Sequence, residues 1–171
     1  MSSIQIGSFW LWYNRVNNLH LSHYYLVTQF ILLSLFYYHL YKNKIQKKIT
    51  LSILLVVVSV LIVQSYLNPD LLYKFNLLEI LCTSLTLVLF SVIQFYNSLS
   101  ETKKFTYVNS GIFIYLLSST LIFCSGNIMT ELDPSINKLV WFMNVVLYLV
   151  YQLLITFEWY QNFRNHNNTI T

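Results

Sequence analysis

The chain has 171 residues, of which 56% are hydrophobic and only 9% are charged, with a formal net charge of +4. An average soluble domain is about 25% charged, so this composition excludes a water-exposed surface over most of the chain. The positive balance is typical of the cytoplasmic loops of membrane proteins, and we expect no nucleic-acid partner. The two cysteines lie within apolar stretches and are interpreted as packed hydrophobic residues. The composition therefore indicates an integral membrane protein that contacts a lipid bilayer.

The predicted elements begin with residues 1–21, an interfacial segment that carries the aromatic cluster Phe9 to Tyr13. Residues 22–159 hold about five apolar stretches, each near the 20 residues that cross a bilayer as a helix. The expected spans are Ser22–Tyr41, Thr50–Leu67, Asn76–Asn97, Val108–Asn127 and Leu139–Trp159. Residues 160–171 form a polar tail. The prediction is an all-α, polytopic transmembrane helix bundle.

The loops between these spans carry unequal numbers of basic residues. One side holds Lys42, Lys44, Lys47, Lys48, Lys103, Lys104 and Arg164, and the other holds Arg15, Lys74 and Lys138. Cytoplasmic loops carry the excess of Lys and Arg. The sequence therefore predicts a cytoplasmic C-terminal tail and an N-terminus outside the cell.

The third span carries a carboxylate, Glu79, together with polar residues at helical spacing, among them Asn76 and Thr83. A polar stripe on a spanning helix faces other helices or a water-filled cavity, because lipid cannot satisfy it. We expect Glu79 near the outer boundary, where it makes an interhelical hydrogen bond or reaches the interface. The alternative is a proton or cation site, to which Asn144 on the fifth span is a further candidate contributor.

Two histidines, His20 and His23, are spaced i, i+3 before the first span, on the same predicted side as Glu79. We interpret them as interfacial residues and expect no metal and no other cofactor. The alternative is a three-ligand metal site made of His20, His23 and Glu79.

Small residues recur every seven positions on the fourth span, at Gly111, Ser118 and Ser125. Such a seam lets helices approach closely, within one chain or between copies in a homo-oligomer. We interpret it as a packing feature.

Short motifs on the later spans carry a resemblance. They are Phe105, the run Asn109 to Tyr115 and, further on, Trp141 and Asn144; upstream, Tyr25 to Tyr38, Asn76 to Glu79 and Tyr96 fit the same layout. With these motifs the chain resembles the uncharacterised, sensor-like multi-pass membrane proteins of Bacteroidota. The resemblance implies a bacterial inner-membrane location and supplies no catalytic residues.

Three functional classes remain open at this point. The first is a non-enzymatic sensory, signalling or accessory subunit that acts through another membrane protein, since the chain has no kinase core. The second is a small transporter or channel subunit. The third is a membrane-embedded enzyme acting on lipid, for which only His20, His23 and Glu79 come close to a clustered set of reactive groups.

Overall fold

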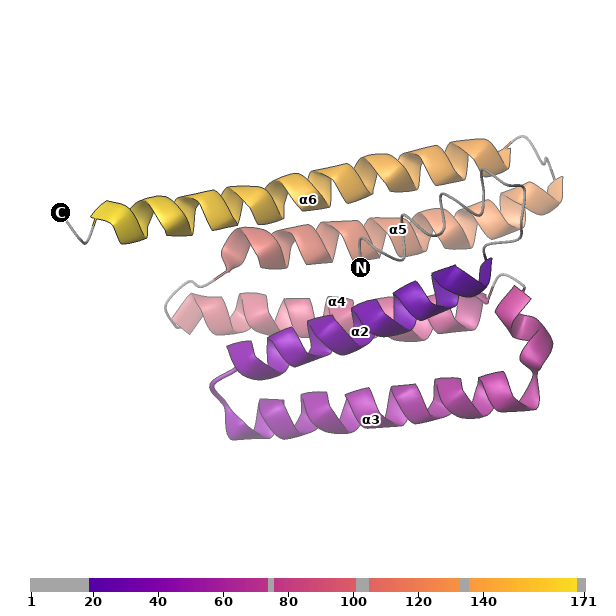
Figure 1. The fold of residues 1–171 in the computed structure, drawn as a ribbon, viewed down its shortest axis with the longest axis horizontal. Helices are drawn as coiled ribbons and strands as arrows, with labels where there is room; N and C mark the ends of the chain where they lie inside the picture. Colours follow the sequence, from indigo (N-terminus) through magenta and orange to yellow (C-terminus); the bar gives the residue numbers. More distant parts are fainter. Residues whose placement is uncertain (1–18, 74–75, 101–104, 133–135, 169–171) are drawn as a thin grey trace. The chain divides into compact units, whose positions relative to one another are not determined.

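The structure, a computed structural model, describes residues 19–73, 76–100, 105–132 and 136–168 (Figure 1). The elements are α2 (Leu19–Leu40), α3 (Lys44–Leu67), the 3-10 helix η1 (Pro69–Tyr73), α4 (Leu77–Ser100), α5 (Thr106–Leu132) and α6 (Ile136–Asn168). No strand occurs in these ranges, which confirms the predicted all-α fold. The predicted interfacial segment lies mostly in residues 1–18, outside the described residues.

Four stretches in the described part of the chain are long and apolar enough to cross a membrane. They are α3, α4, Thr106–Ser125 of α5 and Lys138–Asn162 of α6. The other long helix, α2, has 22 residues, but histidine, tyrosine and glutamine side chains lower its hydropathy. Four of the five expected spans therefore meet the criteria of length and composition, and the chain is a membrane protein.

Two helices extend well beyond one end of an expected span, α3 at its start and α6 at its end. The Asn43 side chain accepts a hydrogen bond from the backbone N–H of Ile45 at 2.8 Å, so α3 begins at Lys44. The sequence predicted a loop for Lys44, Lys47 and Lys48. They lie instead on the first turns of α3. Lysine is a good helix former, and an N-cap outweighs the unfavourable position of cations at a helix N-terminus. At the other end of the chain, α6 continues through Asn168.

The chain divides into two compact units, and the first comprises Met1–Thr86. Its described part contains α2, α3, η1 and the first residues of α4. The helices α2 and α3 form an antiparallel hairpin (Figure 1). Phe30, Tyr37, Leu54 and Leu61 are buried in its core. Much of the remaining surface of α3 is apolar and exposed, as expected for a helix that contacts lipid.

The second unit comprises Leu87–Thr171 and contains the rest of α4, together with α5 and α6. The helices α5 and α6 pack along each other (Figure 1). Leu87, Phe90, Ile112 and Leu116 are buried. The rings of Tyr115 and Tyr151 stack between α5 and α6 with their centroids 5.3 Å apart. Each unit thus has an apolar and aromatic core, within which polar side chains occupy separate places.

Candidate functional site

The start of α4 places a carboxylate inside the first unit. Asn76 precedes the helix, and its side-chain oxygen accepts a hydrogen bond from the Glu79 backbone N–H at 3.3 Å. This contact satisfies one of the four backbone N–H groups that the first turn of a helix leaves without a partner. A carboxylate in that turn also interacts favourably with the helix dipole. The sequence Asn-Leu-Leu-Glu therefore explains both the start of the helix and the position of Glu79.

The Glu79 side chain meets a histidine from another helix. Glu79 Oε2 lies 2.5 Å from His23 Nδ1, and the two side chains are only 6% and 10% exposed. The two residues are 56 positions apart, so this contact joins α2 to α4. A buried carboxylate needs such a partner, because taking a charge out of water is strongly unfavourable.

Two amides extend this contact into a polar cluster, defined here as His23, Gln64, Asn76 and Glu79. Asn76 Nδ2 lies 3.5 Å from Glu79 Oε2, and Gln64 Nε2 of α3 lies 3.5 Å from Asn76 Oδ1. These two hydrogen bonds are long and therefore weak. Among the described residues, no donor reaches the buried Oε1 atom of Glu79, nor that of Gln64. The cluster thus has more acceptors than the protein groups around it satisfy.

The residues predicted to form a polar or proton site do not all lie together in the structure. Glu79 and Asn76 belong to the polar cluster, and the buried Thr83 lies one turn further along α4, where its hydroxyl donates to the Glu79 carbonyl oxygen at 2.8 Å. Asn144 does not belong to the cluster. It lies on α6 in the second unit and accepts a hydrogen bond from Ser119 of α5 at 2.6 Å. In the described part of the chain, its role is an interhelical bond of the second unit.

The metal alternative receives no geometric support. Within the described ranges, no three His, Cys, Asp or Glu side chains are placed so that they could hold a metal ion. His20, His23 and Glu79 therefore do not form the three-ligand set that their predicted positions allowed. The His23–Glu79 contact is instead a two-residue contact that joins α2 to α4.

A second polar contact, within the second unit, was not anticipated. Ser91 of α4 donates to Asn109 Oδ1 of α5 at 2.9 Å, and Asn109 Nδ2 donates to the Ser91 carbonyl oxygen at 3.1 Å. Both residues are at most 1% exposed. Ser91 is an isolated polar residue in an apolar run, whereas Asn109 stands directly before Ser110, so nothing in the sequence pointed to their pairing. Buried polar residues in spanning helices are expected to find partners on neighbouring helices.

Glu158 on α6 also meets another helix. Its Oε2 atom accepts a hydrogen bond from the Tyr107 backbone N–H at 2.7 Å, at the start of α5. The first turn of α5 supplies unpaired N–H groups and the positive end of the helix dipole, both of which favour a carboxylate. Glu158 is 8% exposed, so this contact anchors α6 to the beginning of α5.

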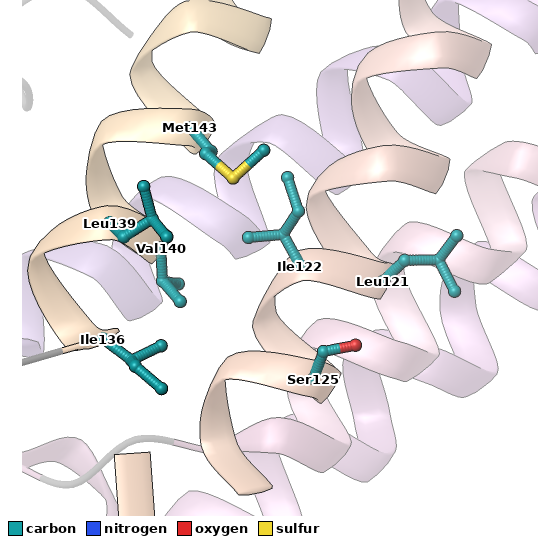
Figure 2. A pocket seen from close by; sticks show the side chains of 7 residues that line it. All are labelled: Leu121, Ile122, Ser125, Ile136, Leu139, Val140 and Met143. Atoms are coloured by element: carbon teal, nitrogen blue, oxygen red, sulfur yellow. The ribbon is translucent and has the colours of Figure 1, made fainter. Parts of the chain in front are cut away.

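The small-residue seam changes in character along α5. At Gly111, an added Cβ would lie 3.1 Å from Tyr151 Cδ2 and 3.3 Å from Leu154 Cβ, so α5 and α6 approach closely there. Ser118 is half-buried and Ser125 is exposed. Ser125 lines an apolar hollow of about 230 Å³ between α5 and α6, with aliphatic residues and Met143 as the other walls (Figure 2). No titratable side chain lines the hollow. The polar cluster, which contains a carboxylate and an imidazole, is therefore the better candidate for a functional site.

Comparisons with family models, with curated proteins and with solved structures found no match.

Proposed function

We propose that this chain is a non-enzymatic membrane protein of sensory or accessory type, which acts through another protein in the same membrane. The proposal includes a bacterial inner-membrane location, several crossings with the C-terminal tail in the cytoplasm, and kinship with the sensor-like proteins of Bacteroidota. Long apolar helices support the membrane location. The distribution of basic residues supports the orientation.

One observation carries the proposal, namely the buried His23–Glu79 contact between α2 and α4. Polar groups in the described helices are used to join one helix to another, as Ser91–Asn109 and Ser119–Asn144 also do. A contact of this kind stabilises the arrangement in which the two helices are joined, relative to one in which they are separated. A signal can act by changing the relative populations of these two arrangements.

A small transporter or channel subunit is the second candidate. The observation that favours it is the row of polar side chains from Gln64 through Asn76 to Glu79 and His23, since ionisable groups within spanning segments often mark ion pathways. The two long contacts of 3.5 Å in this row make it a weaker path than an unbroken relay.

Flux measurements distinguish the two candidates. The purified chain is reconstituted into lipid vesicles, and gradients of H⁺, Na⁺ and K⁺ are imposed in turn. For a sensory or accessory protein we expect no flux above that of empty vesicles. A cation flux that Glu79→Gln removes would replace this proposal with the transporter.

Cross-linking tests the need for a partner. A photo-reactive amino acid at Val56, which is 62% exposed on α3, should trap a second membrane protein in cells. The matched control is Leu54 on the same helix, which is 8% exposed and should trap none. Equal trapping at both positions, or trapping of lipid alone at Val56, would contradict an accessory role on this face.

A further inference from the structure

We propose that the start of α3 binds one anionic phospholipid, whose phosphate is held by Lys44 and Lys48 and whose acyl chain lies along the exposed aliphatic side of the same helix. This inference goes beyond the proposed function and requires only that the chain is a membrane protein. Two features of the first unit support it, namely the charge at the turn between α2 and α3 and the side chains that α3 carries next to that charge.

Basic residues gather at one end of the α2–α3 hairpin. Residues 42–48 contain four lysines, and residues 1–69 contain no aspartate or glutamate. The first carboxylates of the chain, Asp70 and Glu79, lie at the opposite end of α3, where Asn76 joins Glu79 to Gln64 (Figure 1). The positive end of the α3 dipole adds to the charge of the lysines. This end of the hairpin therefore attracts anions.

The lysines on the first turns of α3 are of two kinds. Lys47 is half-buried, and its ammonium nitrogen lies 5.5 Å from the centroid of the Tyr38 ring of α2, a distance at which the ring attracts a cation. Lys44 and Lys48 are exposed, and neither forms an ion pair with a described carboxylate. They are four positions apart, so their Cβ atoms lie about 5–6 Å from each other on one face of the helix. One phosphate group can therefore accept hydrogen bonds from both ammonium groups.

The same side of α3 continues as an aliphatic surface. Successive residues of an α-helix are turned by about 100°, so Leu51, Leu55 and Ile62 lie on the side of α3 that carries the two exposed lysines. Each of these three side chains is at least 41% exposed. A phospholipid has the same order of groups, an anionic head followed by an apolar chain. Val56, where we expect a partner protein, is turned by about 100° from Leu55, so the lipid and the partner contact different sides of the helix.

An anionic head group fits the two lysines better than a zwitterionic one. Phosphatidylcholine carries a quaternary ammonium group beside its phosphate, which repels the lysines, whereas phosphatidylglycerol carries no cation. A lysine close to anionic lipid strengthens binding by about fivefold, so two lysines favour phosphatidylglycerol by up to about 25-fold at low salt.

The test measures which lipid contacts α3 when the full chain is reconstituted into vesicles. A bimane fluorophore is attached at Ser59→Cys, an exposed position one turn beyond Leu55, in a chain carrying Cys82→Ser and Cys124→Ser. The vesicles contain phosphatidylglycerol and phosphatidylcholine in varied proportions, and bromine atoms on the acyl chains of one lipid quench the fluorophore on contact. We expect phosphatidylglycerol to bind beside the label about 5- to 25-fold more strongly than phosphatidylcholine. Equal binding of the two lipids would overturn the inference.

The native Cys82 provides a matched control position. It is exposed on α4, three residues after Glu79 and therefore at the end of the first unit opposite to the lysines. The same fluorophore on Cys82, in a chain with native Ser59 and with Cys124→Ser, should show no preference for phosphatidylglycerol. An equal preference at both positions would show a general enrichment of anionic lipid around the protein and would overturn a site on α3.

Variants then assign the phosphate to its lysines. Lys44→Gln and Lys48→Gln should each lower the preference measured at Ser59→Cys by about fivefold, and together they should remove it. The matched control is Lys138→Gln, which removes an exposed lysine from the start of α6 and should leave the preference intact. A full preference in the double variant would overturn the assignment.

Salt tests the same contact without any change to the lysines, and it remains decisive if a variant fails to fold. The Debye length falls from about 10 Å at 0.1 M salt to about 3 Å at 1 M. The preference of the labelled chain with native Lys44 and Lys48 should therefore approach one at the higher concentration. A preference that is the same at both concentrations would show that the lysines do not select the lipid.

Discussion

The polar contact of the first unit and that of the second unit join helices by different chemistry. His23 and Glu79 are both titratable, and one carboxyl oxygen is left without a donor in the described structure. Ser91 and Asn109 are uncharged and exchange hydrogen bonds in both directions. The first contact therefore joins two ionisable groups and leaves one acceptor without a donor, whereas the second pairs a donor and an acceptor in each direction. A membrane protein can use the first for response and the second for permanent attachment.

The largest expected effect comes from breaking the first contact on one side. His23→Leu leaves Glu79 buried without its partner, and removal of one member of a buried pair typically costs about 3–5 kcal/mol. Because replacement of both members by apolar residues is often neutral, the double variant with Glu79→Leu should recover most of the loss. Unfolding in an SDS titration at pH 7 measures both. Equal stability of His23→Leu and the native chain would show that the pair contributes nothing.

The next effect concerns the close approach of α5 and α6 in the second unit. Gly111→Leu forces a side chain against Tyr151 and Leu154, where even a Cβ lies within 3.3 Å of both. We expect overpacking to lower the free energy of unfolding by about 1–3 kcal/mol, which thermal unfolding in detergent measures. The matched control is Ser125→Leu at the exposed end of the seam, with an effect within about 0.5 kcal/mol. Similar losses in both variants would contradict a seam whose tight contact is at Gly111.

The smallest expected effect comes from weakening the uncharged Ser91–Asn109 contact of the second unit. Ser91→Ala removes one donor from Asn109, and polar contacts between membrane helices contribute about 0.6 kcal/mol on average and about 1.7 kcal/mol at most. The loss should be the same at pH 5 and pH 8, because neither partner titrates in that range. Unfolding titrations at the two pH values measure it. A pH-dependent loss would show that the two contacts are not chemically distinct.

The local features of α4 were largely predictable. The expected span Asn76–Asn97 differs from Leu77–Ser100 by a few residues, since a long apolar run preceded by a capping residue defines a helix by itself. The spacing of Asn76, Glu79 and Thr83 predicted one face, and both Glu79 and Thr83 are buried. The pattern of residues along α4 was therefore enough to predict the bounds of the helix and its buried polar face.

The pairing of side chains from different helices was harder to predict. The sequence placed His23 and Glu79 on one predicted side of the membrane, but it interpreted the histidines as interfacial residues and did not pair them with Glu79. The alternative three-ligand set with His20 is not formed by the described residues. Nothing local distinguishes Asn109 as the partner of Ser91, because many combinations of isolated polar residues fit apolar helices equally well. Likewise, the backbone N–H of Tyr107 could not be predicted as the partner of Glu158, because every residue except proline carries such a group.

The cap at Asn43 has a consequence for the depth of the chain in the bilayer. With 24 residues at 1.5 Å each, α3 is about 36 Å long, compared with a hydrocarbon core of about 30 Å. The surplus is about one turn, and the lysines at the start of α3 occupy it, with the aliphatic stems of their side chains able to extend towards the lipid phosphates. In a thicker bilayer this turn would be drawn towards the core, where lysine is unfavourable. The start of α3 therefore matches the chain to a bilayer of ordinary thickness.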